Sequence, residues 1–372
     1  MKKFNILHVI SRLPVGGVEN MLFKVVTTYD KERFCPVICC IKDGGEVADK
    51  LKKSGYKVEI LDRMKGHGFD IGAVKGIYDI IKRENIHILR THQYHSNLYG
   101  RLAGIIAGVP AILPSFHNLY RSPDKPKFQR RIFNYILSFF SDKLIAVSNA
   151  VASDVVRYDW VDPVKTEIIY NGIEIEKFNI DLSKEEARKI FNMPVNPRII
   201  GSVGRLTEQK GHRYLIEAAA NAENVEIVIA GDGPLRKELE SLTERLRVKC
   251  IFTGALDHKK IPVFLKSLDM FCFPSLWEGL PSALIEAMAA GLPVIATDIP
   301  PHKEVLGDTG VVVPAGDAGA LTKAVNMLID DPSLMLTVVQ KEKERVKMFS
   351  IDNTTRTYER LFEDILKKKR LL

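Results

Sequence analysis

The sequence predicts an α/β protein with two domains, each a parallel sheet covered by helices. Short apolar runs rich in Val and Ile alternate with segments of helical periodicity about a dozen residues long, a pattern typical of parallel sheets. The chain has 372 residues, which is long enough for two ordinary domains. Its 46% hydrophobic and 27% charged residues exclude a disordered chain.

Thirteen apolar runs are the predicted strands. Seven of them form a first series at residues 4–10, 34–41, 56–61, 86–92, 110–117, 143–148 and 166–171. Six form a second series at residues 198–204, 225–231, 249–254, 269–275, 292–297 and 310–315. A segment with a polar stretch and two prolines lies between the series, so we place the linker near residues 173–182. We expect domains over 1–175 and 176–350, followed by an amphipathic helix near 351–368.

The net charge of +8, from 54 basic and 46 acidic residues, lies in one half of the chain. Residues 1–175 hold 26 basic and 18 acidic side chains, whereas residues 176–372 hold 28 of each. The asymmetry predicts an anionic partner for the first half, which could be nucleic acid, a membrane or a phosphorylated substrate. The sequence contains no recognised nucleic-acid-binding motif, so we do not expect nucleic acid.

Cysteine usage and hydropathy predict a cytoplasmic protein. The five cysteines are an odd number without a C-x-x-C pair, which favours reduced thiols over disulfides or a zinc site. The N-terminal apolar run is far shorter than a membrane span of roughly 20 residues, and no cleavage site follows it. Peripheral binding to the inner face of the plasma membrane stays open.

Gly16 and Gly17 follow the first predicted strand and precede a helix that begins near Val18. Paired glycines allow close approach of a ligand, and a helix N-terminus offers unpaired N–H groups to an anion. A tight turn without a ligand is the alternative. The motif is not G-x-G-x-x-G, and Gly231 opens a G-x-G that lacks the third glycine, so a dinucleotide-dependent oxidoreductase is not favoured.

Arg205 and Lys210 follow the first strand of the second series, beside a predicted helix N-terminus. Two cations in that position suit a diphosphate, because Arg binds phosphate oxygens bidentately and Lys adds a compact charge. A solvated surface pair is the alternative.

The most specific feature is a pair of glutamates, Glu278 and Glu286, that flank a turn and a helix start. Between them Gly279, Leu280 and Ser282 can present backbone N–H groups to a phosphate. Carboxylates near such a phosphate are expected to accept hydrogen bonds from hydroxyls, which suits a ribose diol for Glu286 and a sugar for Glu278. Two carboxylates that merely flank a helix are the alternative.

Residues 201–304 resemble the donor-binding domain of glycosyltransferase family 4. Seven residues separate Glu278 from Glu286, as in the family's E-x7-E motif, and GRLTEQKG is similar to its diphosphate-binding segment. VGGVE, PSFHNLY, LIAVSNAVASDVV and IIYNGIEIEKF extend the resemblance over nearly the whole chain. The resemblance implies the GT-B fold, in which two Rossmann-like domains face each other across a cleft and the C-terminal helix, residues 351–372 here, crosses back to the N-terminal domain.

The resemblance also implies a role for each candidate residue. Arg205 and Lys210 would hold the donor diphosphate, and Gly16 and Gly17 would approach the same phosphates. Glu286 would bind the ribose, and the backbone of Gly231 and of Gly254 to Leu256 would bind the base. Glu278 would contact the transferring sugar, and His117 would lie beside the reacting carbon. Without the resemblance, His117 after a strand end is more simply a structural group than a catalyst.

One departure from the family pattern and one absent motif qualify this picture. Pro300 and Pro301 stand where many relatives have a glycine pair, which predicts a differently shaped loop and leaves donor identity open. We expect Glu304 at a helix N-terminus. The sequence contains no D-x-D motif of the kind that holds a metal in the other large transferase architecture. Fixed cations and a helix dipole can replace that metal, so we expect catalysis without a metal ion or cofactor.

Residues 121–143 carry basic side chains and an apolar stripe at helical spacing. Arg121, Lys127, Arg130 and Arg131 are therefore candidates for contact with a membrane or an acceptor. In the alternative, the apolar stripe packs on the sheet and the cations are merely solvated.

The expected function is a retaining, metal-independent glycosyltransferase. It would move a hexose or N-acetylhexosamine from a nucleotide diphosphate sugar, a UDP-sugar ahead of a GDP-sugar, to a glycan or lipid-linked acceptor in surface polysaccharide synthesis. The alternatives are a GT-B nucleotide-sugar epimerase and a catalytically silent partner subunit that binds nucleotide sugars.

Overall fold

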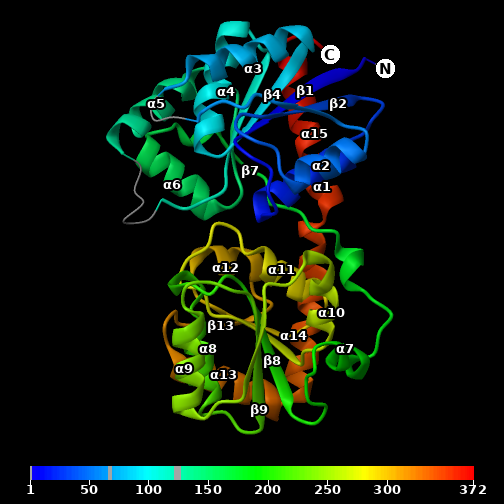
Figure 1. Cartoon of the computed structure of the whole chain (residues 1–372), viewed down its shortest axis with the longest axis vertical. Helices are drawn as coiled ribbons and strands as arrows, with labels where there is room; N and C mark the ends of the chain where they lie inside the picture. The colour runs from blue at the N-terminus through cyan, green and yellow to red at the C-terminus, as the bar shows by residue number, and fades with distance from the viewer. Residues whose placement is uncertain (1, 66–68, 121–126) are drawn as a thin grey trace. The chain divides into compact units, whose positions relative to one another are not determined.

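The computed structural model describes residues 2–65, 69–120 and 127–372, and the chain divides into two compact units (Figure 1). Unit 1 comprises residues 1–172 and 351–372, and unit 2 comprises residues 173–350. Each unit is a parallel sheet with helices on its faces, so the predicted α/β fold class is confirmed. Every predicted apolar run contains a strand, although most strands are shorter than their runs.

Unit 1 contains a seven-stranded parallel sheet in the order β3-β2-β1-β4-β5-β6-β7. The strands are β1 Phe4–Ile10, β2 Phe34–Cys40, β3 Lys57–Ile60, β4 Ile86–His92, β5 Ala111–Phe116, β6 Leu144–Ala146 and β7 Thr166–Ile168. Its helices are α1 Gly17–Thr28, α2 Glu46–Lys53, α3 Ile71–Arg83, α4 Tyr94–Ala107, α5 Phe128–Phe139, α6 Asn149–Asp159, η1 Pro163–Lys165 and α15 Ile351–Lys368.

The C-terminal helix α15 belongs to the core of unit 1, as expected. Tyr358, Phe362 and Leu366 are buried on it, and the Phe362 ring lies 6.0 Å from that of Tyr29 and 5.8 Å from that of Phe34. Burying this apolar stripe holds the end of the chain against β2 and α1.

Unit 2 contains a six-stranded parallel sheet in the order β10-β9-β8-β11-β12-β13. The strands are β8 Arg198–Val203, β9 Val225–Ala230, β10 Cys250–Gly254, β11 Met270–Phe273, β12 Val294–Thr297 and β13 Val311–Val313. Its helices are η2 Ile175–Phe178, α7 Lys184–Ile190, η3 Glu208–Lys210, α8 His212–Ala219, α9 Arg236–Leu246, η4 His258–Lys260, α10 Ile261–Lys266, α11 Ser282–Ala289, α12 Pro300–Leu306, α13 Ala318–Asp330, α14 Pro332–Arg345 and η5 Val346–Phe349.

The prediction that Glu304 starts a helix is wrong. Pro300 and Pro301 occupy the first two positions of α12, and Glu304 lies in its last turn. Proline suits the first turn of a helix because its φ is already helical and its missing N–H has no partner there. The proline pair itself therefore begins the helix.

The two units differ in charge. Unit 1 holds 32 basic and 21 acidic side chains, a net charge of +11, and unit 2 holds 22 and 25, a net charge of −3. No helix among the described residues is long and apolar enough to cross a bilayer.

Candidate functional site

In each sheet the strand order reverses once, between β1 and β4 in unit 1 and between β8 and β11 in unit 2. Loops that leave the carboxyl ends of two such strands run to opposite sides and open a crevice, where open α/β sheets bind ligands. In unit 2 these loops carry Arg205 and Lys210 after β8 and Glu278 after β11. The reversal therefore brings together residues that lie about 70 positions apart in the sequence.

Lys210 and Glu278 form an ion pair between these two loops. The Lys210 Nζ lies 2.6 Å from Oε1 of Glu278, and the two side chains are 19% and 9% exposed. The ammonium also lies 4.9 Å from the centre of the Phe273 ring. Gly204 leaves room for the lysine stem, because a Cβ there would lie 3.1 Å from the Lys210 Cδ. The site thus holds a cation and an acceptor carboxylate side by side in poorly solvated surroundings, where their attraction is little screened.

Gln209 fixes the loop that carries Glu278, and the sequence analysis did not single it out. Its side-chain Nε2 donates to the carbonyl of Trp277 at 2.9 Å and lies 3.5 Å from Oε2 of Glu278. The backbone carbonyl of Gln209 accepts from the N–H of Leu276 at 2.7 Å. The signal available was its position beside Lys210 in GRLTEQKG. Since its amide spans both loops, Gln209 is a positioning residue for the carboxylate.

Arg205 lies exposed in the loop after β8. Within the described part of the chain its guanidinium makes no hydrogen bond or ion pair, unlike the ammonium of Lys210. Of the two predicted cations, Lys210 is therefore preorganised and Arg205 is free to adapt to a ligand.

Glu286 lies on α11 and is buried. Its Oε1 lies 3.4 Å from Nε2 of His258, at the start of η4 after β10. The backbone of Gly254, at the end of that strand, accepts a hydrogen bond of 2.9 Å from the N–H of Gly231. The structure therefore places Glu286 near the loop after β10, to which the candidate base-binding backbone belongs.

Gly231 is required by packing whether or not a ligand binds. Its φ is +153°, and a Cβ at this position would lie 1.9 Å from the carbonyl oxygen of Gly204. Only glycine permits the two loops to approach so closely.

The turn before α11 differs in part from the predicted phosphate nest. The N–H of Ser282 donates to the carbonyl of Leu280 at 3.1 Å, so it is directed at the chain itself. Pro281 precedes the helix and has no N–H to offer. The turn therefore offers fewer backbone donors to an anion than the sequence predicts.

A buried polar cluster under the crevice also escaped the sequence analysis. Nδ1 of His302 lies 2.9 Å from the hydroxyl of Thr297, which donates to the carbonyl of Ser275, and the imidazole lies 5.3 Å from the Phe273 ring. Burial lowers the pKa of His302 to about 3. The neutral ring therefore supports the aromatic platform beneath Lys210 without adding charge.

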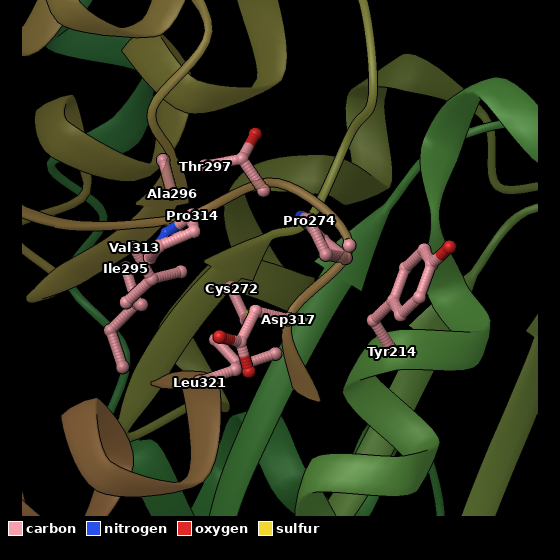
Figure 2. A pocket seen from close by; sticks show the side chains of 11 residues that line it. Tyr214, Cys272, Pro274, Ile295, Ala296, Thr297, Val313, Pro314, Asp317 and Leu321 are labelled. Carbon is pink, nitrogen blue, oxygen red and sulfur yellow. The ribbon is translucent and has the colours of Figure 1, made fainter. Parts of the chain in front are cut away.

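Figure 2 shows a pocket next to this cluster. It is lined by side chains from β11, β12 and β13 and by Tyr214 of α8. None of the predicted site residues is among the described residues that line it. The pocket is therefore separate from the Lys210–Glu278 ion pair.

In unit 1, Gly16 and Gly17 lie at the start of α1, as predicted. Gly16 has an extended backbone with φ of −169°, so its conformation does not demand glycine. Next to this turn, Oε1 of Glu19 accepts from Nε2 of Gln93 at 3.1 Å. Gln93 follows β4 with a φ of +68°, which is uncommon outside glycine and often marks a functional turn. The strand reversal in unit 1 thus joins the glycine turn to a strained residue that the sequence did not reveal.

His117 lies directly after β5 and is buried. Its ring stacks 5.9 Å from that of His92, which in turn lies within 3.1 Å of His8 between ring nitrogens. Burial, reinforced by the charge of Arg90, lowers the pKa of His117 to about 3 and those of His8 and His92 well below 6.5. Neither ring nitrogen of His117 has a hydrogen-bond partner among the described residues. His117 is thus a neutral imidazole with a donor and an acceptor unused.

The predicted membrane or acceptor cations lie on and before α5. Lys127 is exposed at the start of the helix, and Arg121 lies outside the described residues. Arg130 stacks on Tyr94 and Tyr120 with its guanidinium carbon 4.2 Å and 4.8 Å from the ring centres, so it faces the unit.

Among the described residues, no group of three or more His, Cys, Asp or Glu side chains could hold a metal ion.

Comparisons with family models and with known proteins all match glycosyltransferases. The family model described as "Glycosyltransferase Family 4" matches residues 15–177, and that described as "Glycosyl transferases group 1" matches residues 183–345. The chain is 28% identical to the UDP-Gal:alpha-D-GlcNAc-diphosphoundecaprenol alpha-1,3-galactosyltransferase of Escherichia coli, over 99% of this chain and 98% of that protein. It is 30% identical to the alpha-maltose-1-phosphate synthase of Mycolicibacterium smegmatis, over 66% of this chain and 70% of that protein.

A solved structure shares the fold over the whole length. A glycosyltransferase from Rickettsia africae superposes with a TM-score of 0.86 at 23% identity, over 99% of this chain and all of that one.

Proposed function

Since the chain belongs to glycosyltransferase family 4, we propose that this glycosyltransferase moves a hexose or N-acetylhexosamine from a nucleotide diphosphate sugar to a hydroxyl of a glycan or lipid-linked acceptor. We further propose that it retains the anomeric configuration, needs no metal ion or cofactor, and works in the cytoplasm in the synthesis of a surface polysaccharide. The observation that carries the proposal is the Lys210–Glu278 pair at the strand reversal of unit 2.

The pair supplies the two kinds of group that a nucleotide sugar requires. The bond that breaks joins the anomeric carbon of the sugar to a phosphate oxygen, and negative charge develops on the departing diphosphate. Lys210 and Arg205 stabilise that charge, which is the role a metal ion would otherwise have. Glu278 accepts hydrogen bonds from hydroxyls of the sugar, and Gln209 holds its carboxylate in place.

Retention requires the acceptor oxygen to bond the same face of the anomeric carbon that the phosphate leaves. In the proposed step the departing phosphate oxygen takes the proton of the acceptor hydroxyl, so no protein base is needed. His117 is neutral because burial lowers its pKa to about 3, so it contributes hydrogen bonds to the sugar and no charge. Its unused ring nitrogens fit that role.

The proposed donor is a UDP-sugar and the proposed acceptor is lipid-linked. Support comes from the Escherichia coli relative, whose name gives a UDP-sugar donor and a diphosphoundecaprenol-linked acceptor, and which aligns over nearly the whole length of both chains. Glu286, buried on α11, would hold the ribose of the nucleotide.

The test compares Glu278→Gln with Glu278→Ala. We expect both variants to lose transfer while nucleoside diphosphate still binds, because the amide of Gln has one neutral acceptor oxygen where the carboxylate has two charged ones. Transfer is measured with UDP-sugars and lipid-linked acceptors in the presence and absence of EDTA, and proton NMR of the product gives its anomeric configuration. Glu244→Gln on the exposed part of α9 is the matched control and should keep full activity.

Different results would favour different conclusions. An active Glu278→Ala enzyme would remove the assigned role of this carboxylate, and loss of activity in EDTA that Mg²⁺ restores would refute metal independence. Release of a free epimerised nucleotide sugar would indicate an epimerase, and tight binding without turnover of any acceptor would indicate a silent partner subunit.

A further inference from the structure

The outward face of α5 is apolar. Six large hydrophobic side chains on the helix and its C-cap are exposed, between 41% for Tyr135 and 64% for Phe128. The outer face consists of these residues: Phe128, Phe133, Tyr135, Ile136, Phe139 and Phe140. At about 100° per residue they fall within one arc of roughly 160° of the helix circumference. Figure 1 shows α5 at the rim of unit 1, beside α6.

The polar side of α5 faces the interior instead. Nδ2 of Asn134 donates to Oδ2 of Asp159 at 2.8 Å, and its carbonyl oxygen accepts from the buried guanidinium of Arg101. Tyr120 donates to the same oxygen of Asp159 at 2.8 Å. Rotating the helix to bury its aromatic rings would take the Asn134 side chain away from buried Arg101 and Asp159, and losing a hydrogen bond to a buried charged group is costly. These hydrogen bonds therefore hold the apolar face outward.

Arg130 and Arg131 of α5 also make contacts within unit 1, and these contacts help to hold the apolar face outward. Arg130 stacks on Tyr94 and Tyr120, and Arg131 donates to the carbonyl of Tyr158 and lies 4.1 Å from the ring of Trp160. The sequence predicted either a basic, aromatic-bearing helix that contacts a membrane or an apolar stripe that packs on the sheet beside solvated cations. In the structure the apolar stripe is exposed and both arginines are half-buried against aromatic rings, which differs from the second arrangement.

The apolar surface continues beyond the helix. Trp160 is 43% exposed, and its ring meets the edge of the Phe128 ring at 6.2 Å between centres. At the other end, Nζ of Lys165 donates to the carbonyl oxygens of Ser138 and Phe139 at 2.8 Å and 3.1 Å, so a cation closes the helix C-terminus. Single exposed hydrophobic residues are ordinary, but a contiguous patch of this kind marks an interaction surface.

We propose that the outer face of α5 docks unit 1 on an anionic phospholipid bilayer, with its aromatic rings inserted among the lipid chains at the interface. A helix with an apolar face and cationic flanks lies in the plane of a membrane surface in this way. Charge complementarity selects this occupant: α5 contains no acidic residue, Lys127 and Lys165 stand at its two ends, and unit 1 carries a net charge of +11. Anionic lipid attracts such a surface by electrostatics before the rings insert.

The test measures sedimentation of the full chain with vesicles, without donor or acceptor. Vesicles of phosphatidylcholine with phosphatidylglycerol are compared with phosphatidylcholine alone, at low and high salt. We expect wild type to bind the anionic vesicles and Phe133→Ser/Phe139→Ser to bind them at least about tenfold more weakly. Ile71→Ser/Leu336→Ser removes two side chains outside α5 that are more exposed than Phe133 and Phe139, and this variant should bind like wild type.

A second measurement reports insertion directly. The chain contains two tryptophans, Trp160 and Trp277. In a Trp277→Phe background the fluorescence of Trp160 should shift to the blue with anionic vesicles and be quenched by brominated lipid chains. The melting temperature of each variant is measured alongside, because exposed positions should tolerate serine without unfolding.

The proposal is overturned if wild type does not sediment with anionic vesicles, or if the Phe133→Ser/Phe139→Ser variant binds as wild type does. A wild-type dimer that becomes monomeric in this variant, without any vesicle binding, would assign the outer face to a second copy instead. Because vesicle binding needs no sugar nucleotide, a failure here leaves the proposed transferase activity untouched, and the reverse also holds.

Discussion

At the residue scale, the ion pair of Lys210 and Glu278 changes what each side chain does. A lysine on an open loop would be a flexible, hydrated charge, whereas here Glu278 and the Phe273 ring fix the ammonium in place. An ammonium has three donors, so one can bind the carboxylate while the others remain for a phosphate. The pair therefore suits a ligand that carries phosphate and hydroxyl groups next to each other.

We predict that Lys210→Ala weakens binding of UDP by about tenfold to a hundredfold, since a hydrogen bond to a charged group contributes about 1.5–3 kcal/mol. Arg205→Ala should also weaken binding of UDP, and the double variant should weaken it most. Isothermal titration calorimetry measures the affinity. Lys249→Ala, which removes an exposed lysine paired with Glu226, is the control and should bind UDP like wild type. Unchanged affinity in the double variant would disprove the diphosphate assignment.

At the element scale, the paired loops after β8 and β9 depend on a glycine, Gly231, that packing requires whether or not a ligand binds. Because a Cβ on residue 231 would meet the carbonyl of Gly204 at 1.9 Å, the loops must separate if any side chain is added. Gly254, with a φ of +74°, has open space where its Cβ would be. An alanine at position 231 would therefore meet a steric clash. An alanine at position 254 would meet only an unfavourable backbone angle.

We predict that Gly231→Ala lowers the stability of unit 2 by at least about 2 kcal/mol, whereas Gly254→Ala costs only about 1 kcal/mol. Thermal unfolding followed by circular dichroism measures both variants, with wild type as the reference. Equal melting temperatures for the two variants would mean that the loops relax around the new Cβ.

Local sequence patterns were good predictors of elements but not of their contacts. Each apolar run became a strand because alternation with helical segments leaves few other folds for the chain. The outward orientation of the apolar face of α5 could not be predicted, because an apolar stripe on a helix normally indicates a buried face. The partners that reverse it, Arg101 and Asp159, lie on α4 and α6. Gln209 and Gln93 were missed for the same reason, since each acts on a loop distant in sequence.

At the scale of the whole molecule, both units contain histidines that burial keeps neutral. The pKa is lowered to about 3 for His117, His212 and His302, and well below 6.5 for His8 and His92. In the unfolded chain each would have a pKa near 6.5. Below that pH the unfolded chain binds protons that the folded protein excludes.

We therefore predict that the protein loses stability as the pH falls from about 6.5 towards the folded pKa values, and is unaffected by these groups above about pH 7. Each histidine that stays neutral in the folded protein lowers the free energy of unfolding by about 2 kcal/mol as the pH falls from about 7.5 to about 5. Denaturant unfolding over this range measures the loss. Proton NMR should show imidazole signals of the buried histidines that do not titrate above pH 5. Stability independent of pH in this window would contradict the prediction.

The sequence by itself determined the α/β class, the thirteen strands and the motifs that identify the family, because these depend on residue type and spacing along the chain. Only the tertiary structure decided which residues meet. The strand reversals bring Lys210 to Glu278 and Gln93 to Glu19, and buried hydrogen bonds turn the apolar face of α5 towards the solvent. The physical reason is that strand order and the partners of buried polar groups are long-range choices, which no local pattern encodes.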